Sequence, residues 1–217
     1  MTDSKILKKD LFGEIRLLAH GGTRVIVRDT REAAAGLRWL ARVLMRREAR
    51  ILALLAEVDG VADVVQLESD RLLRSYIDGI PLHHSRPTDP DFFAAATRLR
   101  RAIQRAGIVH NDLAKEPNIL VRADGSPAFI DFQMAWHSST RSKLFRIAAR
   151  EDLRHLLKHR RYYCPDSLTR REQEILANPS LAAKVWRNSA KPVYLFVTRR
   201  VLGWADREGA GDRGERA

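Results

Sequence analysis

Polar side chains that could handle a metal ion and a proton are concentrated in one short stretch, "IVHNDLAKEPNILVRADGSPAFIDF". Asp112 stands between an apolar approach and a polar loop, Asn118 precedes the apolar run "ILV", and Asp131 follows the run "AFI". The intervening "RADGSP" carries Asp-Gly, which favours a hairpin turn. Because one hairpin strand starts where its partner ends, we expect Asn118 and Asp131 to converge, with Asp112 on the loop beside them.

These residue types suit one kind of chemistry. Carboxylate and amide oxygens are the ligands that magnesium prefers, which fits Asn118 and Asp131. A carboxylate beside such a metal, here Asp112, can orient a hydroxyl and accept its proton. Together they form the equipment for phosphoryl transfer from a nucleotide, where catalysis is mostly positioning and charge neutralisation. Taken singly, each residue is also a common turn former.

The first 78 residues read as strands with one helix. "LFGEIRLLAHGGTRVIVRDT" predicts two strands joined at Gly21-Gly22, because glycine readily supplies the positive φ of a tight hairpin. Apolar residues then recur at helical spacing from Leu40 to Val58. "VADVVQLESDRLLRSYI" predicts two further short strands around a Ser-Asp turn, and "DGIPL" a connector.

The remainder reads as mostly helical. Asp89 and Pro90 are typical of a helix start, and Gly107 closes the apolar stripe that follows. A further helix is expected near 144–158, and Thr169-x-x-Glu172 is a possible capping box for one more. The pattern predicts an α+β, two-lobed protein with the boundary at "SYIDGI".

The amino-acid composition is typical of a globular protein. The chain has 217 residues, 45% of them apolar, which fits a globular protein with a real core. No apolar run approaches the ~20 residues of a membrane span, and the first residues lack the apolar segment of a signal peptide. Cys164 is the single cysteine, so a reducing cytoplasmic location is the simplest expectation.

Positive charge is concentrated toward the C-terminus. The net charge is +12, of which residues 141–217 carry +9. Such a region fits an anionic partner (a phosphorylated glycan, a membrane surface or, less favoured, nucleic acid) or an ordinary solvated face. A helix over 192–204 would place apolar residues on one face beside Arg199 and Arg200. That helix is expected either at the inner face of an anionic membrane or packed back on the domain.

"HNDLAKEPNIL…IDF" resembles the catalytic loop and metal-binding segment of protein-kinase-like phosphotransferases, above all the minimal, atypical members: RIO-type kinases and the lipopolysaccharide-core Kdo/heptose kinases. The resemblance implies Asp112 as the catalytic base and Asn118 and Asp131 as magnesium ligands. It implies a structural role for His110, and for Asp152 a role in bracing the catalytic loop from below. It covers roughly 11–158 and does not fix the phosphate acceptor.

The N-terminal part fits the same template. In the family a helix glutamate, here Glu48, pairs with a strand lysine that holds the nucleotide phosphates. The matching strand position is Arg28, and "HGG" would be a reduced phosphate-covering loop or an ordinary hairpin. The hinge "LLRSYIDGIPL" would turn backbone groups toward adenine. The nucleotide contacts implied are Gly21, Gly22, Arg28, Glu48, Ser75 and Ile77.

Four departures from the family pattern stand out. Asn111 replaces the arginine that pairs with an activating phosphate, so regulation by activation-loop phosphorylation is not expected. The interval from Asp112 to Asn118 is one residue longer than usual and holds Lys115, a candidate catalytic residue that neutralises the transferred group, or a solvated side chain. Gln133 stands where glycine is common and predicts a fixed Asp131. Arg28 replaces lysine, which differs in geometry.

The prediction is therefore a two-lobed protein-kinase-like fold with a small β-rich N-lobe, a mainly helical C-lobe and a minimal activation segment. We expect an N-lobe over 1–78, a C-lobe over 79–163 and a basic helical extension over 164–217. ATP and Mg²⁺ are the expected cofactors, and a serine or threonine hydroxyl of a protein the expected acceptor. The alternatives are a kinase of an anionic lipopolysaccharide-core sugar and a pseudokinase binding module.

Overall fold

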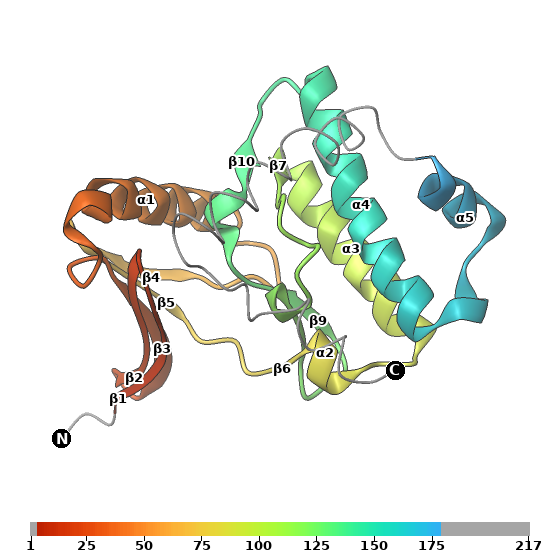
Figure 1. The fold of residues 1–217 in the computed structure, drawn as a ribbon. Coiled ribbons are helices and arrows are strands. Elements are labelled where there is room, and N and C mark those ends of the chain that lie inside the picture. The colour runs from red at the N-terminus through yellow and green to blue at the C-terminus, as the bar shows by residue number, and fades with distance from the viewer. Residues whose placement is uncertain (1–3, 179–217) are drawn as a thin grey trace.

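A computed structural model describes residues 4–178 as a twisted sheet with one helix beside a mainly helical part (Figure 1). The sheet is antiparallel with the order β1-β2-β3-β5-β4. Its strands are β1 (Ser4–Asp10), β2 (Gly13–His20), β3 (Thr23–Asp29), β4 (Val64–Leu67) and β5 (Arg71–Ser75). The mixed α+β fold predicted from the sequence is confirmed.

The predicted hairpin at "HGG" joins β2 to β3. His20 pairs with Thr23 across a two-residue turn in which Gly21 and Gly22 both have positive φ, 57° and 80°. Both backbones lie in the left-handed region that glycine enters without steric cost. Strand β1, which the sequence analysis did not anticipate, pairs with β2 at the sheet edge, and most of its side chains are exposed.

One long helix, α1 (Arg38–Leu54), packs on this sheet after the short 3-10 turn η1 (Ala35–Leu37). Met45 and Ala49 on its inner face meet Leu72 of β5 in a small core cluster. Glu48 lies on the same buried side of the helix and is fully buried. The apolar stripe therefore places one carboxylate between helix and sheet.

The second part is built around two long antiparallel helices, α3 (Pro90–Arg105) and α4 (Lys143–Tyr163), which pack side by side (Figure 1). The side chain of Asp89 caps α3 by accepting from Asp91 N, with Pro90 at the first helical position, as predicted. The helix expected near 144–158 is longer at its C-terminal end. Helices α2 (Leu82–Ser85) and α5 (Arg170–Ala177) complete this part, and Thr169 and Glu172 form the predicted capping box.

Two small sheets hold the loops that lie between the long helices and the larger sheet. The order β6-β8-β9 joins Ile80–Pro81, Ile119–Val121 and Pro127–Phe129, and β10 (Trp136–His137) pairs with β7 (Ile108–Val109). The turns η2 (Glu116–Asn118), η3 (Phe132–Met134) and η4 (Pro165–Ser167) lie between these elements. Only five residues separate β10 from α4, as the prediction of a minimal activation segment requires.

In the C-terminal third, the structure describes residues as far as Asn178. Of the predicted extension 164–217, the structure describes η4 and α5, and α5 packs on α4. The proposed amphipathic helix over 192–204 lies outside the described residues. Within the described part, no helix has the length and apolar character needed to cross a membrane.

Candidate active site

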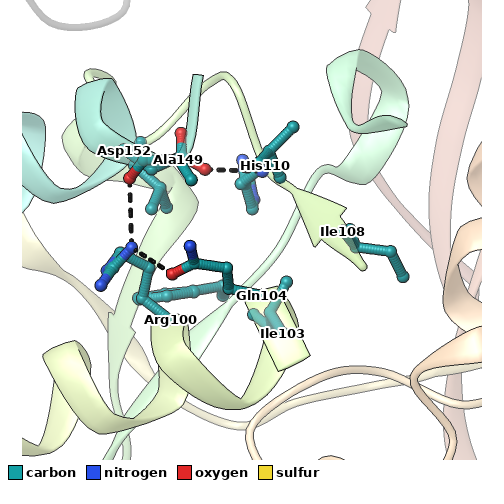
Figure 2. Close-up of a pocket in the computed structure, with 10 residues that line it drawn as sticks. Arg100, Ile103, Gln104, Ile108, His110, Ala149 and Asp152 are labelled. Carbon is teal, nitrogen blue, oxygen red and sulfur yellow. Dashed lines mark hydrogen bonds between the residues drawn. The ribbon is translucent and has the colours of Figure 1, made fainter. Parts of the chain in front are cut away.

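The loop carrying Asp112 is fixed from behind by a buried carboxylate on α4. Asp152 accepts from the backbone N–H of His110 at 2.7 Å (Figure 2). It also accepts from the backbone N–H of Asn111 at 2.9 Å. Asn111 has a φ of 62°, and its side chain donates to Met134 O at 3.2 Å. Burial raises the pKa of the Asp152 carboxyl above its ordinary value, against the effect of these N–H groups. Asp152 thus braces the loop, as its resemblance to the family implies.

A second buried polar residue faces the same side of the loop. Arg100 of α3 donates through one terminal nitrogen to Gln104 Oε1 at 3.0 Å and to Ala149 O at 3.1 Å (Figure 2). Burial lowers the pKa of this guanidinium below its ordinary value, although the charge of Asp152 opposes the shift. Arg100 therefore ties α3 to α4 where α4 carries Asp152.

His110 connects the two halves of the site. Its Nε2 lies 3.0 Å from Ile130 O, and its Nδ1 lies 3.3 Å from the backbone N of Asp112. Since a carbonyl only accepts and an N–H only donates, Nε2 carries the proton and Nδ1 accepts. Burial lowers the pKa of His110, which agrees with this neutral form. His110 is thus a structural residue that spans the loop and the strand leading to Asp131.

Asp112 has two side-chain partners within its own loop. Its Oδ2 accepts from Asn118 Nδ2 at 2.9 Å and lies 3.0 Å from Lys115 Nζ. Burial raises the pKa of Asp112, while Lys115 and Asn118 act in the opposite direction. Such a carboxylate, partly buried and held by an amide and an ammonium, is oriented rather than free to rotate.

The β8–β9 hairpin brings Asn118 and Asp131 together as the sequence predicts. Ile119 pairs with Phe129, and Ile130 N donates to Asn118 O at 3.0 Å, so Asp131 follows directly beside Asn118. Asp131 adopts a φ of 64°, an uncommon conformation for a non-glycine residue. Burial raises its pKa, but the surrounding positive charges outweigh that effect and hold the pKa below its usual value.

Asn118 and Asp131 line a cleft of about 280 Å³ between the larger sheet and the second part. The apolar side chains Ile15, Ile26, Leu120 and Ile130 line one portion of it, and Arg28, Arg74, Asn118, Asp131 and Gln133 line the polar portion. Hydrophobic walls with a few convergent polar groups are typical of small-molecule sites. This cleft is therefore the candidate ligand-binding site.

The donor set of this cleft fits a magnesium ion. Asn118 donates through Nδ2 to Asp112. None of the hydrogen bonds described for residues 4–178 involves Asn118 Oδ1. Asp131 adds a carboxylate from across the hairpin. In the same residues no cluster of three His, Cys, Asp or Glu side chains could hold a metal by itself. Two protein oxygens suit magnesium, which usually completes its shell with water and substrate phosphate.

Arg28 takes the place expected for the strand lysine. Its Nε lies 3.2 Å from Glu48 Oε2, and both side chains are buried. The Gln133 amide lies against the same guanidinium and, with its oxygen turned toward Arg28, accepts from Nε at 3.1 Å. The predicted Arg28–Glu48 pair therefore forms, and Gln133 ties it to the segment that carries Asp131.

Sequence reasoning missed Arg74. This β5 residue is 7% exposed, lines the cleft, and points its Nε to within 3.6 Å of Glu48 Oε1. The available signal was a charged residue inside the apolar run "RLLRSYI", two positions after the buried Leu72 on the same strand face. That signal does not identify a partner, because Glu48 is 26 residues away.

The structure does not bring Gly21 and Gly22 to the polar end of the cleft. They are exposed at the β2–β3 tip and are not among the lining residues. Arg28 lies five positions along β3 from Thr23, roughly 17 Å in an extended strand. The cleft is instead approached by β1, through Leu7, Lys8 and Asp10. Because the side chains of β1 are mostly exposed, its sequence gives little sign of a strand beside the cleft. Contact of Gly21 and Gly22 with a nucleotide stays a prediction.

The hinge residues Ser75 and Ile77 both line the cleft. Ser75 N donates to Asp63 O at 2.9 Å and Tyr76 N to Arg24 O at 3.1 Å, so these N–H groups are engaged within the larger sheet. The main-chain hydrogen bonds described for this segment leave the N–H of Ile77 unused. Ile77 is therefore better placed than Ser75 to donate to a ligand.

The loop that is one residue longer than usual is held from α4. His159 Nε2 lies 2.9 Å from Leu113 O, and its Nδ1 lies 3.5 Å from Glu116 Oε1. Tyr163 OH donates to Glu116 Oε2 at 3.0 Å. Burial raises the pKa of Tyr163 above its ordinary value, and the charge of Glu116 acts in the same direction. These contacts explain how the longer loop keeps Asp112 and Asn118 together.

The sequence model of the RIO domain matches residues 23–175, more than two thirds of the chain. The chain belongs to the RIO family. The match includes α1, the hinge, the catalytic loop and α4. The resemblance to RIO-type atypical kinases stated from the sequence is confirmed. A comparison with curated proteins finds no significant match.

Solved structures support the RIO fold. A crystal structure of the Rio2 kinase from Chaetomium thermophilum has a TM-score of 0.62 and 17% identity, covering 81% of this chain and 62% of that one. A Rio2 kinase–ADP/Mg²⁺–phosphoaspartate complex from the same organism has a TM-score of 0.61 and 15% identity, covering 87% and 66%. The chain thus spans slightly under two thirds of each Rio2 chain, 62% and 66%.

Proposed function

We propose that this RIO-family protein is an ATP- and Mg²⁺-dependent kinase that transfers the γ-phosphoryl group to a serine or threonine hydroxyl. The observation that carries the proposal is the convergence of three groups: Asp112 accepts from Asn118, and the β8–β9 hairpin sets Asp131 beside Asn118. The use of ADP and Mg²⁺ named for the similar Rio2 complex supports the same cofactors here.

Each residue has a proposed role that follows from its position. Asp112 accepts the proton of the acceptor hydroxyl, and Lys115 offsets negative charge beside it. Asn118 Oδ1 and the Asp131 carboxylate hold magnesium, which when bound neutralises charge on the phosphates. Arg28, kept in place by Glu48, contacts the phosphates. Ile77 supplies a main-chain contact to the base.

The division of the chain follows the same proposal. Residues 1–78 would act as the nucleotide-binding lobe, because they supply the larger sheet, α1 and Arg28. Residues 79–163 would act as the catalytic lobe, since they contain the loop of Asp112 and its supports on α4. The assembled Asp112, Asn118 and Asp131 favour an active kinase over a pseudokinase, because a module that only binds does not require all three.

The test is phosphoryl transfer from γ-labelled ATP in the presence of magnesium, to the protein itself and to a mixture of serine- and threonine-containing proteins. We expect incorporation by the wild type and its loss in Asp112→Asn, with binding of ADP retained. Asp124→Asn is the matched control, because Asp124 is exposed at the tip of the β8–β9 hairpin. Equal transfer by Asp112→Asn and wild type would refute the assignment of the base.

A further inference from the structure

Two buried arginines share one carboxylate at the polar end of the cleft. Arg28 Nε lies 3.2 Å from Glu48 Oε2, and Arg74 Nε lies 3.6 Å from Glu48 Oε1. Each arginine is 7% exposed and Glu48 is fully buried. Burying a guanidinium is costly unless it is paired and its N–H groups are hydrogen-bonded, so two guanidinium groups on one carboxylate compete for few acceptor oxygens.

Arg74 is the arginine whose N–H donors lack hydrogen-bond acceptors in the described part of the chain. A guanidinium has five N–H donors, and none of the hydrogen bonds described for residues 4–178 uses any of those of Arg74. Its buried Nε has no hydrogen-bond partner in that part of the chain. Arg28, in contrast, has both the closer contact to Glu48 and the Gln133 amide.

The fold aims Arg74 at the proposed phosphate end of the cleft. Arg74 pairs with Ile26 across the sheet, and Arg28 lies two positions further along the same strand face. Arg74 lines the cleft together with Asp131. The charges of Arg28 and Arg74 are the two strongest influences that oppose burial and lower the pKa of Asp131. Both guanidinium groups are therefore close to this carboxylate.

We propose that Arg74 is a second phosphate-binding residue, whose guanidinium donates to a phosphate oxygen of a bound nucleoside diphosphate or triphosphate while Arg28 remains paired with Glu48. The inference rests on the proposed nucleotide-binding function. An anionic ligand supplies the acceptors that Glu48 lacks, and charge-assisted bonds from arginine to phosphate are among the strong ones. The arginine at position 28, where the family has lysine, then acts together with Arg74 and does not imply loss of phosphate binding.

The experiment compares the dissociation constants of ADP with magnesium and of adenosine by calorimetry. In Arg74→Met, which keeps a side chain of similar length without charge, we expect ADP binding to weaken roughly ten- to a hundred-fold. Adenosine affinity should stay at the wild-type value, because adenosine has no phosphate. Arg74→Lys, which keeps the charge but not the fork, should bind ADP with intermediate affinity and guards against a folding defect of the methionine variant.

Arg71→Met is the matched control. Arg71 lies on the same strand, pairs with Asp29 and does not line the cleft, so ADP affinity should be unchanged. Unchanged ADP binding by a folded Arg74→Met protein would overturn the inference and leave the proposed kinase function standing. An equal loss for ADP and adenosine would also overturn it, because Arg74 would then act on the base. Failure of the wild type to bind any nucleotide would overturn both proposals.

Discussion

The imidazole of His159 on α4 reaches the main chain of the catalytic loop, with Nε2 2.9 Å from Leu113 O. Because a carbonyl oxygen only accepts, Nε2 carries a proton and donates. The other ring nitrogen lies 3.5 Å from Glu116 Oε1, so one side chain contacts the lengthened segment at two points. Helix α4 therefore holds the loop through Asp152 at its start and through His159 and Tyr163 beyond Asp112.

We expect His159→Leu to lower kcat because the loop loses its donor to Leu113 O while the nucleotide cleft is untouched. Misplacement of a catalytic group by about 1 Å costs roughly a hundred-fold, so a loss of roughly ten- to a hundred-fold is expected. The KM for ATP should change little, since His159 does not line the cleft. His159→Gln, which retains a donor, should recover part of kcat. Steady-state kinetics with wild-type kcat in His159→Leu would contradict this role.

Lys115 should shift the pH dependence of phosphoryl transfer through its effect on the pKa of Asp112. Burial raises the pKa of Asp112, and the charge of Lys115, 3.0 Å away, lowers it. A general base acts when deprotonated, so activity rises with pH through the pKa of Asp112. Removing the positive charge in Lys115→Met raises that pKa, so the acid limb of the kcat profile should move to higher pH. Lys143→Met is the control, because Lys143 is exposed at the start of α4, and it should leave the acid limb of the kcat profile in place. An acid limb that does not move in Lys115→Met would show that the charge of Lys115 does not affect the pKa of Asp112.

The magnesium dependence of nucleotide binding should depend on Asp131. In the wild type, magnesium should strengthen ADP binding, because Asp131 and Asn118 supply its protein ligands. In Asp131→Asn, which keeps the shape but loses the charge, magnesium should have little effect on the dissociation constant of ADP. Titrations with and without magnesium measure this, with Asp124→Asn as the control. A full magnesium effect in Asp131→Asn would show that another group holds the ion.

Gly107, which precedes β7, should be sensitive to a single added methyl group. Its φ is 74°, and a Cβ there would lie 2.8 Å from Ser138 O, the residue that follows β10. Gly125 also has a positive φ, 78°, but open space around its Cβ position. Alanine at either position would have to adopt the left-handed backbone conformation, which should lower the free energy of unfolding by roughly 1–2 kcal/mol. Denaturant unfolding should show a larger loss for Gly107→Ala; equal losses would mean that the β7–β10 approach tolerates the methyl group.

Local sequence determined much of the fold and the centre of the site. The turn at Gly21-Gly22, the start of α3 at Asp89 and the capping box at Thr169 depend on neighbouring residues, which a sequence displays directly. The convergence of Asn118 and Asp131 was also predictable, since a short hairpin fixes which strand ends meet. Functional residues that lie on adjacent strands or in tight turns can therefore be predicted from the sequence.

Tertiary packing decided which distant residues complete the site. The pairing of Arg74 with Glu48 depends on how α1 lies on β5, and the contact of His159 with Leu113 joins residues 46 positions apart. Strand β1, with its mostly exposed side chains, gives only a weak apolar pattern, yet it borders the cleft. A charge within a strand shows that it needs a partner, but only the packed fold specifies the partner and the side of the sheet on which the two meet.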